Sequence, residues 1–264
     1  MLCGMVQFTE RKDAARLAWT FTPGRSPTVL FLPGFRSDMT GAKALEVAAW
    51  CEGAGQACLR LDYSGHGRSG GAFTDGAIGV WTADALHLID TLTEGPLLLM
   101  GSSMGGWIML LLALARPHRV VGLIGIAAAP DFTEATMWQA MLPAERTRLM
   151  TEGILHAPSE YGVDLPITRT LIEDGRRHLL MGAPIKLACP VRLLQGQADP
   201  DVPWETALRL AARLDAEDIQ VILIKDGDHR LSRPGDLRLL RETLAALLQQ
   251  CGSEPLAVAG IAPA

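Results

Sequence analysis

The chain has 264 residues, with 24 Lys and Arg against 29 Asp and Glu, and carries a formal net charge of −5. Hydrophobic residues make up 48% and charged residues 20%, which is enough apolar material for a large core and excludes a disordered chain. The mild acidity and the lack of a basic run exclude nucleic acid as the main partner, because binding to phosphates needs clustered Lys and Arg.

The five cysteines are scattered along the chain, and none belongs to a C-x-x-C pair. Such a set predicts neither a disulfide framework nor a thiolate zinc site, and it indicates a reducing compartment. The first 21 residues lack the charged, apolar and small segments of a signal peptide, and Glu10 and Asp13 are unusual in a transit peptide. We therefore expect a cytoplasmic protein.

Short apolar runs alternate with segments of helical period along most of the chain. Strands are predicted at 6–9, 17–22, 28–32, 58–61, 97–100, 120–127, 191–195 and 219–225, and helices at 41–51, 78–92, 104–115, 204–214 and 237–249. The first two strands are expected to be antiparallel. The later strands are continuous apolar runs, typical of a parallel sheet covered by helices. The predicted fold is α/β, with a mostly parallel central sheet and helices on both faces.

The 21 uncharged residues 95–115 meet the length requirement for a membrane span. A cluster of glycines and serines at 101–106 divides this stretch into a short strand and a helix. We therefore predict no transmembrane segment.

Residues 130–184 interrupt the alternation of strands and helices. This segment is rich in proline, methionine and aromatic residues and has no clear strand, so it predicts a lid of short helices inserted after the sixth strand. An irregular crossover packed on the sheet edge is the alternative. Residues 1–129 and 185–251 would form the core, and 252–264 a loosely ordered tail.

A G-x-S-x-G pattern, Gly101-Ser102-Ser103-Met104-Gly105, lies between a predicted strand and a predicted helix. That context is typical of a nucleophile elbow, a sharp turn that exposes a serine hydroxyl, and it makes Ser103 the candidate nucleophile. The alternative is a glycine-rich packing turn with a buried serine.

A serine nucleophile needs a base, and the base needs an acid. In the chain order of this kind of site, acid and then histidine follow the nucleophile. His229 follows the last predicted strand, whereas the other five histidines are expected at the surface or in the lid. Asp199 is the first carboxylate after the preceding strand. Asp201 is its nearby competitor and Asp131 a more remote one.

An oxyanion hole needs two backbone N–H groups that point at one place. Met104 follows the nucleophile at a helix N-terminus, and Phe35 follows the third strand in a Pro-Gly-Phe turn; their amides are the candidates. The glycine-rich loop 62–69 lacks a phosphate-binding lysine and is expected to form a wall of the active-site entrance. This chemistry requires no cofactor and no metal.

Over nearly its whole length the sequence resembles the α/β-hydrolases, and more narrowly the family of the mitochondrial palmitoyl-protein thioesterase that also cleaves acyl glucuronides. The resemblance implies esterase and thioesterase activity without a cofactor, with Ser103, Asp199 and His229 as the triad. The matching segments are 32–35, 38–41, 43–44, 62–65, 101–107, 190–194, 202–204 and 228–230.

The predicted function is hydrolysis of carboxylic esters or thioesters through an acyl-enzyme, with a small molecule or an acyl-protein as substrate. Met137, Trp138 and Met141 of the lid would suit an acyl chain, or belong to the core of the lid. Arg169, Arg176 and Arg177 are candidates for contact with an anionic leaving group. The alternatives are a non-catalytic binding protein, a C–C hydrolase or a perhydrolase on the same fold.

Overall fold

A computed structural model describes residues 4–11, 15–157 and 164–253. Its centre is one sheet of eight strands in the order β1-β2-β4-β3-β5-β6-β10-β12. The first two pairings are antiparallel and the other five are parallel. The strands are β1 (Gln7–Thr9), β2 (Leu17–Thr22), β3 (Arg25–Leu32), β4 (Gln56–Leu61), β5 (Leu97–Ser102), β6 (Val120–Ile126), β10 (Val191–Gly196) and β12 (Ile219–Ile224).

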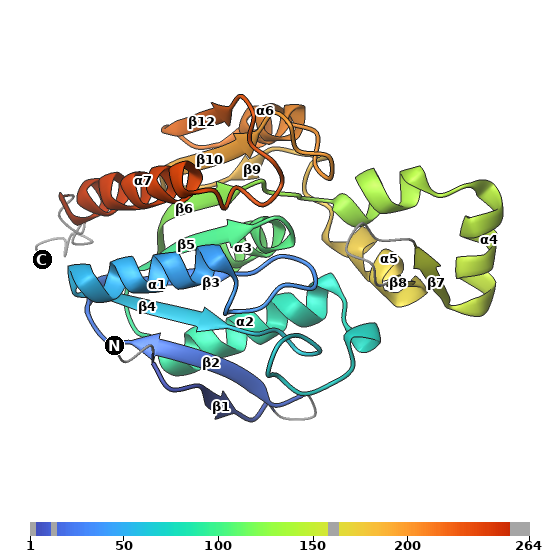
Figure 1. Ribbon diagram of the computed structural model, residues 1–264, viewed down its shortest axis with the longest axis horizontal. Helices are drawn as coiled ribbons and strands as arrows, with labels where there is room; N and C mark the ends of the chain where they lie inside the picture. Colours follow the sequence, from blue (N-terminus) through green and yellow to red (C-terminus); the bar gives the residue numbers. More distant parts are fainter. Residues whose placement is uncertain (1–3, 12–14, 158–163, 254–264) are drawn as a thin grey trace, which may run out of the picture.

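Helices cover both faces of this sheet, as the buried runs of β4, β5 and β10 require (Figure 1). On one face, α1 (Ala42–Ala54) and α7 (Pro234–Ser253) pack together over one buried apolar cluster. On the other face, α2 (Ile78–Leu92), α3 (Met104–Ala115) and α6 (Glu205–Arg213) contribute to a second. Helix α1 ends where Gly55 takes a left-handed conformation, with φ 66°. The predicted fold class is confirmed.

The insertion, residues 130–184, projects beside the sheet in Figure 1. It contains a π-helix (Thr133–Trp138), α4 (Pro143–Glu152), β7 (Ile154–Ala157), β8 (Leu165–Thr168), α5 (Arg169–Gly175) and a 3₁₀ turn (Arg176–His178). Outside it, a 3₁₀ turn (Phe73–Asp75) precedes α2, and β9 (Ile185–Lys186) pairs with β11 (Leu214–Asp215). The expectation that the insertion has no strand was wrong, because β7 and β8 pair antiparallel. Four-residue strands, one of them containing Pro166, are too short and irregular to give a period of two.

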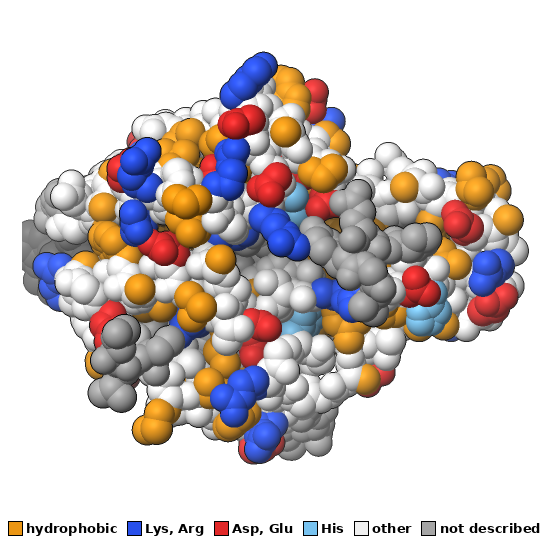
Figure 2. All heavy atoms as spheres, in the orientation of Figure 1, with side chains coloured by type: hydrophobic (Ala, Val, Ile, Leu, Met, Phe, Trp, Pro, Cys, Tyr) orange, Lys and Arg blue, Asp and Glu red, His pale blue; other side chains and the backbone are white. Residues whose placement is uncertain are grey.

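The first two residues of the predicted tail, 252–264, belong to the end of α7. The helix continues to Ser253, and residues 254–264 lie outside the described part of the chain. Among the described residues, no helix has both the length and the apolar character needed to cross a membrane. On the face shown in Figure 2, Lys and Arg side chains are interspersed with Asp and Glu.

Candidate active site

Ser103 occupies the sharp turn between β5 and α3. Its backbone has φ 53° and ψ −118°, a conformation that a non-glycine residue adopts only when its surroundings hold it. Two hydrogen bonds help to do so: the Ser103 N–H donates to the Ile126 carbonyl at 2.9 Å, and the Ala129 N–H donates to the Ser103 carbonyl at 3.1 Å. A Cβ atom on Gly105 would overlap the Leu32 carbonyl oxygen, so the turn needs glycine there. Ser103 is half-buried and directly follows the carboxyl end of β5.

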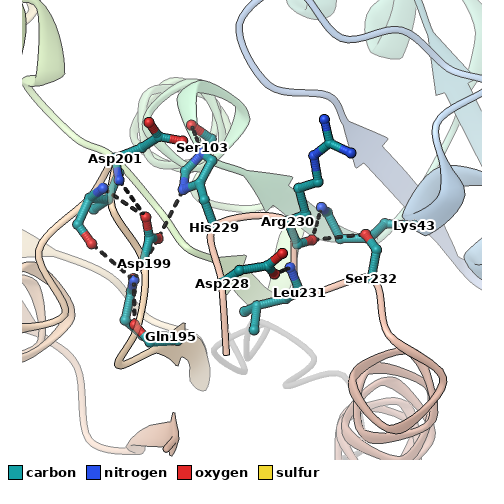
Figure 3. Close-up of polar contacts among 12 residues, drawn as sticks. Lys43, Ser103, Gln195, Asp199, Asp201, Asp228, His229, Arg230, Leu231 and Ser232 are labelled. Atoms are coloured by element: carbon teal, nitrogen blue, oxygen red, sulfur yellow. Dashed lines mark hydrogen bonds and ion pairs between the residues drawn. The ribbon is translucent and has the colours of Figure 1, made fainter. Parts of the chain in front are cut away.

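The structure brings Ser103, His229 and Asp199 together, although 126 residues separate the first two along the chain (Figure 3). The His229 Nε2 atom lies 3.1 Å from Ser103 Oγ, and its Nδ1 atom lies 2.9 Å from Asp199 Oδ2. With a proton on Nδ1, the ring donates to the carboxylate and accepts from the serine hydroxyl. This arrangement can remove the proton of a serine that attacks a carbonyl carbon.

The Asp199 side chain has no exposed surface, yet both of its oxygens are fully used. Oδ1 accepts from the N–H groups of Asp201 and Val202, each at 2.9 Å, and Oδ2 accepts from Gln195 Nε2 at 3.0 Å as well as from His229. Burial acts to raise the pKa of Asp199, but the hydrogen bonds from His229 and Val202 outweigh it, and the net pKa lies below the usual value. The carboxylate therefore stays ionised beside the imidazole.

Asp201 and Asp131, the two alternatives to Asp199 as the acid of the site, lie in different surroundings. Asp201 is exposed and contacts Asp199 through its backbone N–H, although an oxygen of its carboxylate lies within 4.8 Å of ligand atoms of Asp199 and His229. A cation held by these three groups would compete for the His229 and Asp199 atoms that bond each other. Asp131 is buried and accepts from the N–H groups of Leu180 and Met181 at 2.8 and 2.9 Å, so it joins the start of the insertion to its end.

The loop that carries His229 is held from two sides. Asp228 Oδ1 accepts from the Leu231 N–H at 2.9 Å, which closes a tight turn around the histidine. From α1, the amine of Lys43 donates to the Arg230 carbonyl (Figure 3). Burial lowers the pKa of Lys43 to about 8, although the nearby Asp228 acts to raise it. Sequence reasoning gave Lys43 no role, because 187 residues separate it from Arg230 and only the folded chain brings them together.

The loop after β3 lies against the nucleophile. A Cβ atom on Gly34 would lie 3.3 Å from the Ser103 Cβ and 3.9 Å from its Oγ, so the residue that precedes Phe35 lies close to the reacting oxygen. The Met104 amide is at the first turn of α3, where the helix dipole favours negative charge. Among the described residues, neither of these N–H groups has a hydrogen-bond acceptor.

The expectation that the other histidines lie at the surface or in the lid is wrong for His66. That side chain is 4% exposed, in the loop between β4 and α2, and it bonds to the backbone through both ring nitrogens. By contrast, His118 and His156 are exposed. The sequence of the glycine-rich loop does not indicate that His66 is buried, because the residues that cover the His66 ring come from other elements of the fold.

The three lid residues proposed to contact an acyl chain lie in different surroundings. Met141 is 7% exposed and buried in the insertion's own apolar cluster. Trp138 is half-buried, with the guanidinium of Arg176 at 4.4 Å from its ring centre. Met137 packs against both the insertion's cluster and the main core, so it lies at their boundary.

Of the three arginines predicted to contact a leaving group, Arg177 is exposed and the other two take part in protein contacts. Arg176 pairs with Glu134 at 2.7 Å, and Arg169 donates to the Met150 carbonyl at 3.1 Å.

A serine on a sharp strand–helix turn, above a parallel sheet with helices on both faces, defines an α/β hydrolase. Residues 25–160 match the family model described as serine aminopeptidase, S33. The chain is 40% identical to the human mitochondrial palmitoyl-protein thioesterase ABHD10 over 93% of its own length and 80% of that protein.

Two solved structures agree. The chain is similar to mouse α/β hydrolase domain-containing protein 10, with TM-score 0.87, 38% identity and coverage of 93% of this chain and 99% of that one. It is similar to a protein from Agrobacterium vitis S4 named as a hydrolase, with TM-score 0.86, 41% identity and coverage of 92% and 98%. The chain belongs to the ABHD10 family of α/β hydrolases, and it is a serine hydrolase of the esterase and thioesterase class.

Proposed function

We propose that Ser103 is the nucleophile, His229 the general base and acid, and Asp199 the residue that orients the imidazole. The single observation that carries this assignment is the hydrogen-bonded series from Ser103 Oγ through the His229 ring to Asp199. It begins at the half-buried Ser103, on the strained turn between β5 and α3.

The reaction follows from these positions. Ser103 Oγ attacks the carbonyl carbon of the ester or thioester while His229 Nε2 takes the hydroxyl proton. The amides of Phe35 and Met104 donate to the oxyanion of the tetrahedral intermediate. On collapse, the bond to the leaving alcohol or thiol breaks, and His229 returns the proton to that group. A water molecule then attacks the acyl-enzyme with the same base, and the carboxylic acid leaves.

The proposed substrates are acyl-proteins or small acyl esters with an apolar acyl group. The supporting facts are the named activity of the human relative, a palmitoyl-protein thioesterase, and the aromatic cluster around Phe35, in the loop that lies against the nucleophile. There the Phe35 ring packs edge to face against Phe73 and Phe132, with centroids at 5.0 and 5.7 Å. Met137 is the proposed lid contact for the chain, because it lies at the boundary between the insertion and the core.

The test is turnover of p-nitrophenyl esters and acyl-CoA thioesters of rising chain length by wild type and Ser103→Ala. We expect loss of essentially all turnover in the variant, and labelling of wild type alone by a fluorophosphonate. Equal labelling of both proteins would overturn the assignment of Ser103. A Met137→Ala variant should shift the preferred chain length, whereas Met141→Ala, in the core of the insertion, should lower stability without that shift.

A cytoplasmic location is also proposed. It is supported by the free state of all the described cysteines, Cys51, Cys58, Cys189 and Cys251, which suits a reducing compartment. The named relatives are mitochondrial, and fractionation of the source cells decides between the two locations.

A further inference from the structure

The turn that carries the Phe35 amide contains a residue in an unfavourable conformation. The Ser37 N–H donates to the Gly34 carbonyl at 3.0 Å, which closes a four-residue β-turn. Arg36, at the third position, has φ 58°, and a positive φ at that position alone defines a type II turn. Glycine is the usual residue there, because an L side chain is strained in the left-handed region. The Phe35–Arg36 peptide would therefore rotate toward a type I turn unless another group held it.

The ring of His66 holds that peptide. The Arg36 N–H donates to His66 Nε2 at 3.2 Å, and His66 Nδ1 lies 3.2 Å from the Ser64 carbonyl oxygen. An N–H group can donate only to an unprotonated ring nitrogen, and a carbonyl can only accept. The imidazole is therefore neutral with its proton on Nδ1. Since both nitrogens bond to backbone, neither remains for proton transfer to a substrate.

Hydrogen bonds and aromatic contacts hold the residues that surround the His66 ring. The Ser64 N–H and hydroxyl both donate to Asp84 Oδ2 on α2, at 2.9 and 2.6 Å, and the Trp81 indole N–H donates to the Ser64 carbonyl at 3.1 Å. The His66 ring meets Phe73 and Trp81 edge to face, with centroids 5.1 Å apart in each case. Burial lowers the pKa of His66 against the opposing charges of Asp84 and Asp38, which keeps the ring neutral.

The same aromatic pair supports the other end of the turn. The Phe35 ring packs against Phe73 at 5.0 Å and Trp81 at 5.8 Å. Phe35 is thus held at two places: its ring packs against Phe73 and Trp81, and the peptide that follows it donates its Arg36 N–H to a His66 ring that packs against the same two side chains. We propose that His66 is a positioning residue that keeps this turn in its type II form and so fixes Phe35, whose own N–H belongs to the preceding Gly34–Phe35 peptide, beside the oxyanion. The inference rests on the proposed role of that amide.

The first test compares His66→Phe with His66→Gln. Phenylalanine keeps a planar ring but cannot accept from the Arg36 N–H, whereas glutamine has an oxygen that can accept and an amide that can donate. Loss of one oxyanion donor costs about 10²–10³ in kcat, and a displaced donor costs part of that. We expect kcat on p-nitrophenyl butyrate to fall about 10- to 100-fold in His66→Phe with KM within about threefold, and to fall less than about threefold in His66→Gln.

A second pair of variants separates positioning from simple packing. Glycine adopts φ 58° without strain, so Arg36→Gly should restore the type II turn when the His66 acceptor is missing. Arg36→Ala removes the same guanidinium but keeps the strain. In the His66→Phe background, we expect Arg36→Gly to raise kcat at least about fivefold over Arg36→Ala, with little difference between the two in wild type. Equal kcat for the two double variants would overturn the inference.

A measurement on the wild type covers the case in which His66→Phe does not fold. In ¹⁵N-labelled protein at pH 7, the His66 ring should show a protonated Nδ1 and an unprotonated Nε2. A proton on Nε2 would contradict the bond from Arg36. Failure of the proposed function gives a different result, since wild type would then hydrolyse no ester and take no fluorophosphonate label. If wild type is active and the His66→Phe substitution leaves kcat unchanged, the role of His66 is refuted and the proposed function stands.

Discussion

Replacing Asp199 by asparagine keeps the shape of the side chain but changes its capacity to accept hydrogen bonds. In wild type, Oδ1 accepts from two backbone N–H groups, of Asp201 and Val202, and Oδ2 accepts from Gln195 and His229. An asparagine has one accepting oxygen, and the two backbone donors hold it in the place of Oδ1. The amide nitrogen, a donor, must then face His229.

The substitution therefore reverses the tautomer of the His229 imidazole. With a donor opposite it, Nδ1 of His229 must accept, so the ring proton moves to Nε2, the atom 3.1 Å from Ser103 Oγ. In this tautomer the ring cannot take the serine proton. The corresponding exchange in serine proteases lowers kcat about 10⁴-fold. At 1.36 kcal/mol for each factor of ten, this is about 5.4 kcal/mol of lost transition-state stabilisation. Because the two backbone donors fix the amide orientation, we expect a loss of this size in Asp199→Asn.

The assay is steady-state hydrolysis of p-nitrophenyl butyrate at pH 7 to 9, with thermal unfolding as a check on the fold. Asp201→Asn is the matched control, because it makes the same chemical change two residues away on an exposed side chain. We expect it to keep kcat within about threefold of wild type. The reasoning is refuted if Asp199→Asn keeps kcat within about tenfold of wild type, or if Asp201→Asn shows the larger loss, which would make Asp201 the partner of His229.

Three further predictions concern the support of the site. Gly105→Ala places a Cβ against the Leu32 carbonyl and should lower the free energy of unfolding by about 3 kcal/mol or more in urea denaturation; an unchanged midpoint would contradict the packing described for the turn. The folded-state pKa of Lys43 is about 8 and its unfolded value about 10.4, so the folded protein binds fewer protons between these values and its stability should rise with pH over that window. Lys43→Met should lack this rise, of about 1–3 kcal/mol, when urea midpoints are compared at pH 7.5 and 10. Asp131→Ala leaves two N–H groups at the far end of the insertion without their acceptor and should cost about 2 kcal/mol and speed proteolysis there. Asp131→Asn keeps an acceptor and tolerates φ 60°, so it should cost less, and equal losses in the two variants would contradict the anchoring role.

The sequence by itself predicted the features that depend on neighbours along the chain. Apolar runs buried on both faces indicated the parallel strands, and the glycines around Ser103 indicated a strand–turn–helix because the turn cannot form without them. Helix α2 has the bounds that its period predicted, 78–92. The prediction of Ser103, Asp199 and His229 as a set rested on their places after three strands of the sheet, β5, β10 and β12, because the carboxyl ends of parallel strands lie on the same side of a sheet.

Only the tertiary structure decided features that depend on residues far apart. The sequence favoured Asp199 over Asp201 because it comes first after the strand, but only the folded loop shows that the Asp199 carboxylate reaches the imidazole while Asp201 contributes a backbone N–H. The β7–β8 hairpin forms because Leu155 and Ile167 bury themselves in the insertion's apolar cluster, a long-range gain that no local period records. His66 became a buried, neutral ring because its neighbours come from the β3–α1 loop and α2. Local pattern specifies backbone conformation, whereas burial and hydrogen-bond partners exist only once separate elements pack together.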